Sequence, residues 1–110
     1  MDRLHEYDHW LEKNSKKVTD KSVYLDVNGH FKDKTEVARL VKYNKPTEFE
    51  VVFKENFYQH NQNKPTVIKG IMAHELAHIN HPNTHDAAFK EEAKKLGAGR
   101  YAVAHGKSKR

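Results

Sequence analysis

A helical period opens the chain. Leu4, Tyr7 or Asp8, and Leu11 fall three or four residues apart, and Trp10 lies close to the same face. Residues at this spacing share one side of an α-helix. The pattern therefore predicts an N-terminal helix, and it changes after the polar segment NSKK at residues 14–17.

Three later segments have the character of β-strands. SVYLDVNG, residues 22–29, is β-branched and aromatic and ends in an Asn-Gly turn signal. EVARLVKYN, residues 36–44, fits a helix or an alternating strand, and we interpret it as a strand. EFEVVFKENF, residues 48–57, places Phe49 and Phe53 on one face and predicts a half-buried strand. We expect an antiparallel sheet of about three strands, with EFEVVF as an edge strand beside a cleft.

A second helical region follows the polar segment QHNQNK at residues 59–64, which we interpret as a loop. Pro65 and Thr66 are typical of a helix start. Apolar residues then recur with a helical period from Val67 to about Asn80. Pro82 should end this helix, because a proline disfavours helical geometry in the residue before it.

The segment AAFKEEAKKL, residues 87–96, predicts one more helix. Thr84 or Asp86 can cap its start, and Gly97 marks its end. One side of this helix should pack against the core. That side carries His85, Phe89, Ala93 and Leu96. Taken together, the chain predicts an α+β fold in which the last two helices pack on one face of the sheet.

Composition limits the chemistry that this fold can support. The chain has 110 residues, which suits a single domain spanning residues 1–110, and it contains no cysteine. Disulfides, thiolate zinc sites and a cysteine nucleophile are therefore excluded. A zinc ion in this protein must bind histidine and carboxylate ligands.

Charge and hydropathy indicate where the protein acts. No segment approaches the roughly 20 apolar residues of a membrane span, and the N-terminus has no apolar signal-peptide core. We expect a cytoplasmic monomer that does not enter a membrane. The net charge of +5 favours polyanions such as DNA, or serves only solubility, because the lysines are scattered except in a basic tail at about 105–110.

The strongest chemical signal is an H-E-x-x-H motif within the predicted helix at 67–80. His74 and His78 are four residues apart and project from one face, where they can share a zinc ion. Glu75 is offset around the helix, so that it can reach a water at the metal rather than bind the metal itself. This is the geometry of a general base in zinc-assisted hydrolysis.

A catalytic zinc needs a third protein ligand. We favour His85, since it precedes a helix whose apolar side faces the core. His81 shares the ligand face only if the helix continues, and Pro82 opposes that. His105 and a carboxylate remain alternatives for the third ligand.

Several neighbouring residues have two interpretations each. Asp86 is either a helix cap, which we favour, or an acceptor for a metal ligand. Tyr101 either stabilises an oxyanion or packs in the core. The remaining histidines are interpreted as surface or structural residues, namely His5, His9, His30 and His60.

HELAH followed by HPNTHDAAF resembles the compact zinc peptidases of the SprT-like and WLM group, within the wider gluzincin-type minimal zincins. The matching positions are His74, Glu75, His78, His85, Asp86 and Phe89. The spacer from His78 to His85 is one residue longer than in the tightest WLM-like versions and shorter than in many SprT-like ones. The cysteine zinc ribbon of many bacterial SprT-like proteins is missing.

The resemblance implies a zinc metallopeptidase in which His74, His78 and His85 hold the ion and Glu75 is catalytic. It also implies protein or peptide substrates, which in better-understood relatives are proteins crosslinked to or bound on DNA. Two other functions remain open. One is a zinc-stabilised binding module for nucleic acid or protein that cleaves nothing, and the other is a small DNA-binding accessory with incidental histidines.

Overall fold

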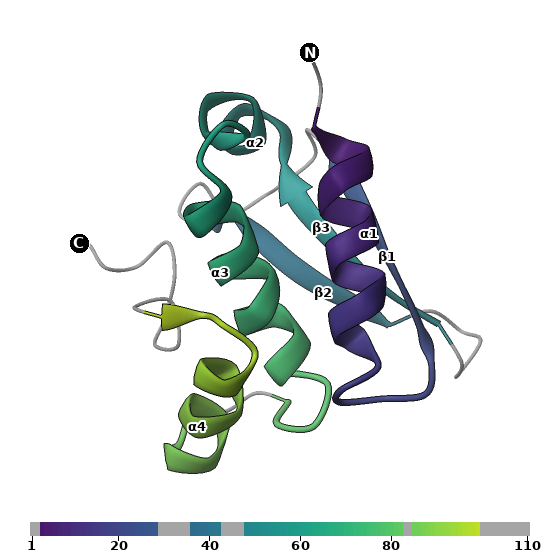
Figure 1. Cartoon of the computed structure of the whole chain (residues 1–110), viewed down its shortest axis with the longest axis vertical. Coiled ribbons are helices and arrows are strands. Elements are labelled where there is room, and N and C mark those ends of the chain that lie inside the picture. The colour runs from purple at the N-terminus through teal and green to yellow at the C-terminus, as the bar shows by residue number, and fades with distance from the viewer. Residues whose placement is uncertain (1–2, 29–35, 43–47, 83–84, 100–110) are drawn as a thin grey trace.

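The computed structural model describes residues 3–28, 36–42, 48–82 and 85–99, and its fold is α+β as predicted (Figure 1). A helix, three strands and three further helices follow one another along the chain. They are α1 (Leu4–Ser15), β1 (Ser22–Asn28), β2 (Ala38–Lys42), β3 (Glu48–Lys54), α2 (Glu55–Asn61), α3 (Pro65–Ala77) and α4 (Ala87–Lys95).

The three strands form a mixed sheet in the order β1-β3-β2. β3 pairs antiparallel with β2 but parallel with β1. The prediction of an antiparallel sheet is therefore wrong for one of its two pairings. The prediction that EFEVVF is an edge strand is also wrong, because β3 lies between the other two. Hydrophobic alternation reports which face of a strand is buried, and it does not report which strands are neighbours.

Register brings the apolar positions of the strands together. Val23 stands beside Phe49, and Val51 stands between Leu25 on β1 and Leu40 on β2. The side chain of Val51 is fully buried. Cross-strand pairs of this kind stabilise a sheet, and they give β3 the most apolar environment of the three strands.

Helices α1 and α3 cover one face of the sheet and contact each other (Figure 1). α1 packs on β1, whereas α3 packs on β2 and β3. The predicted apolar face of α1 is confirmed, since Tyr7 and Leu11 are fully buried. The core-facing side chains of α3 are Ile68, Ile71, Met72 and Leu76. Burying a side chain of this size stabilises the fold by about 1.5–3 kcal/mol.

Helix α2 occupies a segment that we had interpreted as the end of a strand and the start of a loop. Tyr58 is the buried residue of this helix, and its ring meets those of Tyr7 and Phe53 with centroids 6.2 Å away in both cases. Phe57 of the same helix stacks on Phe53 of β3, with ring centroids 6.3 Å apart. The aromatic pair of this short helix belongs to the core, while most of its other side chains are polar, which is why the segment resembles a loop.

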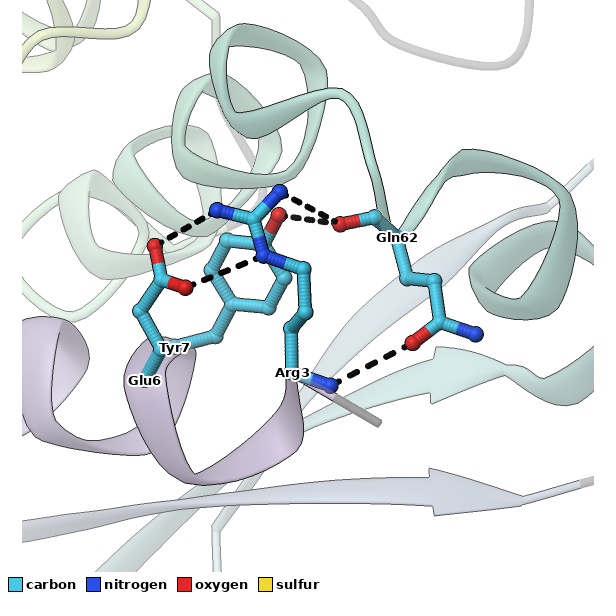
Figure 2. A network of polar contacts seen from close by, with 4 residues as sticks. All are labelled: Arg3, Glu6, Tyr7 and Gln62. Carbon is cyan, nitrogen blue, oxygen red and sulfur yellow. Dashed lines mark hydrogen bonds and ion pairs between the residues drawn. The ribbon is translucent and has the colours of Figure 1, made fainter. Parts of the chain in front are cut away.

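A polar network ties the start of α1 to the loop between α2 and α3 (Figure 2). The Tyr7 hydroxyl donates to the backbone carbonyl of Gln62, and one guanidinium nitrogen of Arg3 approaches the same oxygen at 3.4 Å. The backbone N–H of Arg3 donates to Oε1 of Gln62. Glu6 pairs with the Arg3 guanidinium at 2.9 Å. Burial raises the pKa of the Tyr7 hydroxyl above its ordinary value, while Arg3 lowers it and Glu6 raises it further.

Helix α4 packs against α3 and makes no close contact with the sheet among the described elements. This differs from our expectation that both helices lie on the sheet. Phe89, Ala93 and Leu96 face α3 and are buried as predicted. Over the described residues, every helix is too short or too polar to span a bilayer.

Candidate metal centre

His74 and His78 project from the same side of α3 at its C-terminal end. Pro65 occupies the first turn of α3, as predicted, and His78 is the C-cap residue. Residues four apart lie one above the other on a helix, and the two rings are 4.8 Å apart between centroids. Their Nε2 atoms face each other at 3.2 Å. His74 is buried and His78 is half-buried, so the pair is reached from one side.

His85 joins this pair because of how α4 begins and is held. Asp86 is the N-cap residue, and its Oδ1 accepts a hydrogen bond of 3.0 Å from the backbone N–H of Phe89. The preferred role of Asp86 as a cap is thus confirmed. His85 stands immediately before the cap, and its Nε2 lies 3.4 Å from Nε2 of His74. His85 is exposed rather than directed into the core, so it forms the rim of the cluster.

The C-terminal end of α4 is closed by a glycine. Gly97 has a φ of 100°, and its N–H donates to the carbonyl of Lys94, while the N–H of Ala98 donates to the carbonyl of Ala93. This pair of bonds is the Schellman arrangement, which a residue without a Cβ adopts at little cost. The predicted end of the helix at Gly97 is confirmed, and it seats Ala98 in the core.

The ring of Phe89 packs against all three imidazoles. Its centroid lies 4.9 Å from that of His74, 4.5 Å from that of His78 and 4.9 Å from that of His85. Phe89 is fully buried. An apolar shell of this kind limits the rotation of the rings and keeps water away from their inner side.

The three histidines can hold a metal ion. One nitrogen from each ring is available, and these atoms all lie within 4.8 Å of one another. Two nitrogens bound to one tetrahedral zinc at about 2.0–2.1 Å are about 3.3–3.4 Å apart. The separations of 3.2 Å from His74 to His78 and 3.4 Å from His74 to His85 match this spacing. Two of the three pairs of nitrogens therefore already have the spacing of ligands on one metal ion.

His81 does not join the cluster, although it is close in sequence. α3 ends at Ala77, and its last turn tightens, with the N–H groups of His78 and Ile79 bonded to carbonyls three residues earlier. The helix thus ends five residues before Pro82. The imidazole of His81 instead lies with Nε2 3.3 Å from Oε1 of Glu92 on α4.

Glu75 is buried on α3 and follows His74 directly in the sequence. Burying a charged carboxylate costs free energy of folding unless the carboxylate is paired or hydrogen-bonded. Consecutive residues of a helix are offset by about 100° around its axis. Glu75 is therefore adjacent to the ligand face without sharing it, as the motif predicts.

Other predicted residues lie elsewhere. His5 and His9 are exposed on α1, and His60 is exposed on α2. The basic tail and four of the residues that the sequence singled out lie outside the described residues. These four are His30, Thr84, Tyr101 and His105. Sequence inspection did not single out Glu92, because only the packing of α4 on α3 brings it to His81.

No family model, curated protein or solved structure matches this chain. The resemblance to minimal zincins consequently depends on residues 74–89 and on the cluster that they form.

Proposed function

We propose that this protein is a zinc-dependent metallopeptidase. His74, His78 and His85 would hold the ion, and Glu75 would act as the general base. The observation that carries the proposal is the meeting of three imidazole nitrogens within 4.8 Å, together with a buried glutamate that follows His74 on α3. A structural zinc site is usually closed by four protein ligands, whereas a catalytic site keeps one position open.

The donor set favours zinc among the common metals. Imidazole nitrogens suit zinc, copper, nickel and iron, whereas calcium and magnesium prefer oxygen ligands. Tetrahedral zinc also suits the separations of 3.2 Å from His74 to His78 and 3.4 Å from His74 to His85. When bound, zinc lowers the pKa of a water and polarises the carbonyl group of a substrate.

Glu75 and His85 have the other roles in the proposed reaction. Glu75 accepts the proton of the attacking water and delivers it to the leaving amine, which requires a carboxylate held within reach of both. Its burial protects the carboxylate from bulk water and strengthens its electrostatic interactions. His85 stands on the exposed rim, so a peptide can approach the cluster from that side.

The substrate class follows from the resemblance. Compact zincins of this type act on protein substrates, and we propose protein or peptide substrates here, including proteins associated with DNA. The net charge of +5 would support an approach to DNA through long-range attraction.

Zinc stoichiometry tests the metal site. Elemental analysis of the purified protein should give one zinc per chain, which His85→Ala loses and His81→Ala keeps. His81→Ala removes a neighbouring histidine that faces Glu92 and leaves all three proposed ligands in place, so it should keep the stoichiometry even where its affinity for zinc is lower. Absence of zinc from the unsubstituted protein, after metal has been supplied and the excess removed, would overturn the proposal.

The Glu75→Gln variant separates a peptidase from a zinc-stabilised binding module. A peptidase should keep its zinc and lose cleavage of an unfolded protein substrate by a factor of 10² or more, about the contribution of general-base catalysis. A binding module should keep both zinc and binding. Cleavage that survives the substitution would assign the base role to another residue.

A further inference from the structure

We propose that Glu92 is a positioning residue for the metal ligand His78. The proposal rests on the metal centre proposed above, and it concerns how that centre is kept in shape. Glu92 does not touch the cluster. It acts through the turn at residues 78–81, which joins the ligand helix α3 to the segment leading to α4.

The first step is the contact between His78 and the end of the turn. Nδ1 of His78 lies 3.2 Å from the backbone carbonyl oxygen of His81. A carbonyl oxygen can only accept a hydrogen bond, so Nδ1 carries the proton. The Nε2 lone pair of His78 is therefore left to face His74 and the metal. A second hydrogen bond of this type sets the tautomer and the ring orientation of a metal-binding histidine.

The second step is what holds that carbonyl in place. The turn is anchored at its base by the N–H of His81, which donates to the carbonyl of Ala77 at 3.2 Å. Its outer side is held by Glu92, whose Oε1 lies 3.3 Å from Nε2 of His81 and 3.4 Å from Nδ2 of Asn80. Nδ2 of Asn80 also donates to the backbone carbonyl of Val18, at 3.2 Å. One carboxylate oxygen thus meets two consecutive side chains of the turn.

The third step is the position of Glu92 in the fold. Glu92 lies on α4, three residues after Phe89, which supports all three imidazoles, and seven residues after His85. The contact from Glu92 therefore couples α4, which begins two residues after the ligand His85, to the turn that orients the ligand His78. The chain has no disulfide that could hold these two helices together.

The half-buried setting distinguishes this contact from an ordinary surface ion pair. The side chains of His81 and Glu92 are 23% and 27% exposed, whereas the neighbouring pair of Glu91 and Lys95 is 73% and 74% exposed. Exposed pairs contribute little to stability. Glu91 is accordingly a matched control for Glu92, with the same charge on the same helix but no contact with the turn.

The experiment compares Glu92→Ala, Glu92→Gln and Glu91→Ala with the unsubstituted protein. Zinc affinity is measured by competition with a chromophoric chelator, and the visible absorption of the cobalt(II)-loaded protein reports the ligand geometry. Loss of an outer-shell partner typically weakens metal binding by about 10–100-fold. We expect a loss in this range for Glu92→Ala, together with an altered cobalt spectrum. Glu91→Ala should bind zinc as the unsubstituted protein does.

Glu92→Gln separates positioning from general stability, since it keeps an oxygen at the same place and removes the charge. It should restore zinc affinity to within about threefold of the unsubstituted protein, with the unsubstituted cobalt spectrum. Equal zinc affinity in Glu92→Ala and Glu91→Ala would overturn the inference while leaving the metal centre intact. A protein that binds zinc normally and cleaves nothing would refute the peptidase but not the role of Glu92. Failure of the unsubstituted protein to bind zinc would overturn both.

Discussion

The ring of Phe89 lies against that of His78, with centroids 4.5 Å apart and planes inclined by 33°. The two residues come from different helices, and the contact brings the buried face of α4 under the ligand end of α3. The same ring also meets His74 and His85. One aromatic side chain therefore links the hydrophobic core to the geometry of the candidate metal centre.

Truncating Phe89 should affect both stability and metal binding. Phe89→Ala should lower the free energy of unfolding of the metal-free protein by about 3–5 kcal/mol, because it opens a cavity under the imidazoles. Urea unfolding in the presence of a chelator measures this loss. Phe89→Leu preserves most of the volume and should fold, yet bind zinc more weakly. Unchanged zinc affinity in a folded Phe89→Leu variant would show that the ring of Phe89 does not orient the ligands.

The cap at Asp86 predicts a contrast between two substitutions. Asp86→Ala removes the acceptor for the N–H of Phe89 and should destabilise the protein by about 1 kcal/mol. Asp86→Asn keeps an acceptor oxygen and should be close to neutral. Thermal unfolding measures both effects. If Asp86→Asn binds zinc much more weakly than the unsubstituted protein, the carboxylate has a role at the metal beyond capping.

Tyr7→Phe tests the link between α1 and the α2–α3 loop. It removes the hydroxyl that donates to the carbonyl of Gln62 and keeps the packing of the ring against Tyr58. We expect a loss of about 0.5–1.5 kcal/mol in the free energy of unfolding, the usual net contribution of one hydrogen bond. Zinc affinity should not change, because this network lies at the opposite end of α3 from the histidines. A variant as stable as the unsubstituted protein would assign the link to Arg3 alone.

The raised pKa of Tyr7 predicts that the protein loses some of its stability at alkaline pH. Burial raises the pKa of its hydroxyl above the ordinary value of 10.0, so the unfolded chain releases this proton at a lower pH than the folded protein does. In that interval the folded state binds more protons, and stability falls as pH rises. The contribution is complete below pH 10.0 and is lost as pH rises through the folded pKa. The stability difference between the unsubstituted protein and Tyr7→Phe should therefore shrink at high pH, and a constant difference would contradict the shift.

Metal removal should lower stability reversibly. A ligand that binds only the folded state stabilises it by about 2.7 kcal/mol when its free concentration is 100 times the dissociation constant. Zinc should thus raise the midpoint of thermal unfolding, and a chelator should return it to the metal-free value. His78→Ala should show no such response to zinc. An identical response in this variant would place the bound zinc at another site.

Local sequence patterns predicted most of the elements. The spacing of Leu4, Tyr7 and Leu11 predicted α1, and the alternation around Val51 predicted β3. Each pattern depends only on which side of its own helix or strand is buried. It can therefore be recognised without knowing which other elements pack against that side. The preferred cap at Asp86 was likewise predicted from residues a few positions apart.

Patterns that depend on neighbours were not predicted correctly. β3 was expected at the edge and lies in the centre, and β1 was expected to pair antiparallel and pairs parallel. Helix α2 was missed because a single buried tyrosine and one flanking phenylalanine give too short a period to recognise. Burial at these positions is supplied by α1 and β3, which are distant in the sequence.

The candidate site shows the same division. The spacing of His74 and His78 on one helix turn by itself determined that their rings meet, because helical geometry is set locally by backbone hydrogen bonds. Three other features of the site required α4 to pack on α3. They are the approach of His85 to His74, the packing of Phe89 against the imidazoles, and the contact from Glu92 to His81. That packing depends on the complementary shapes of buried side chains from separate segments, and only the tertiary structure decided it.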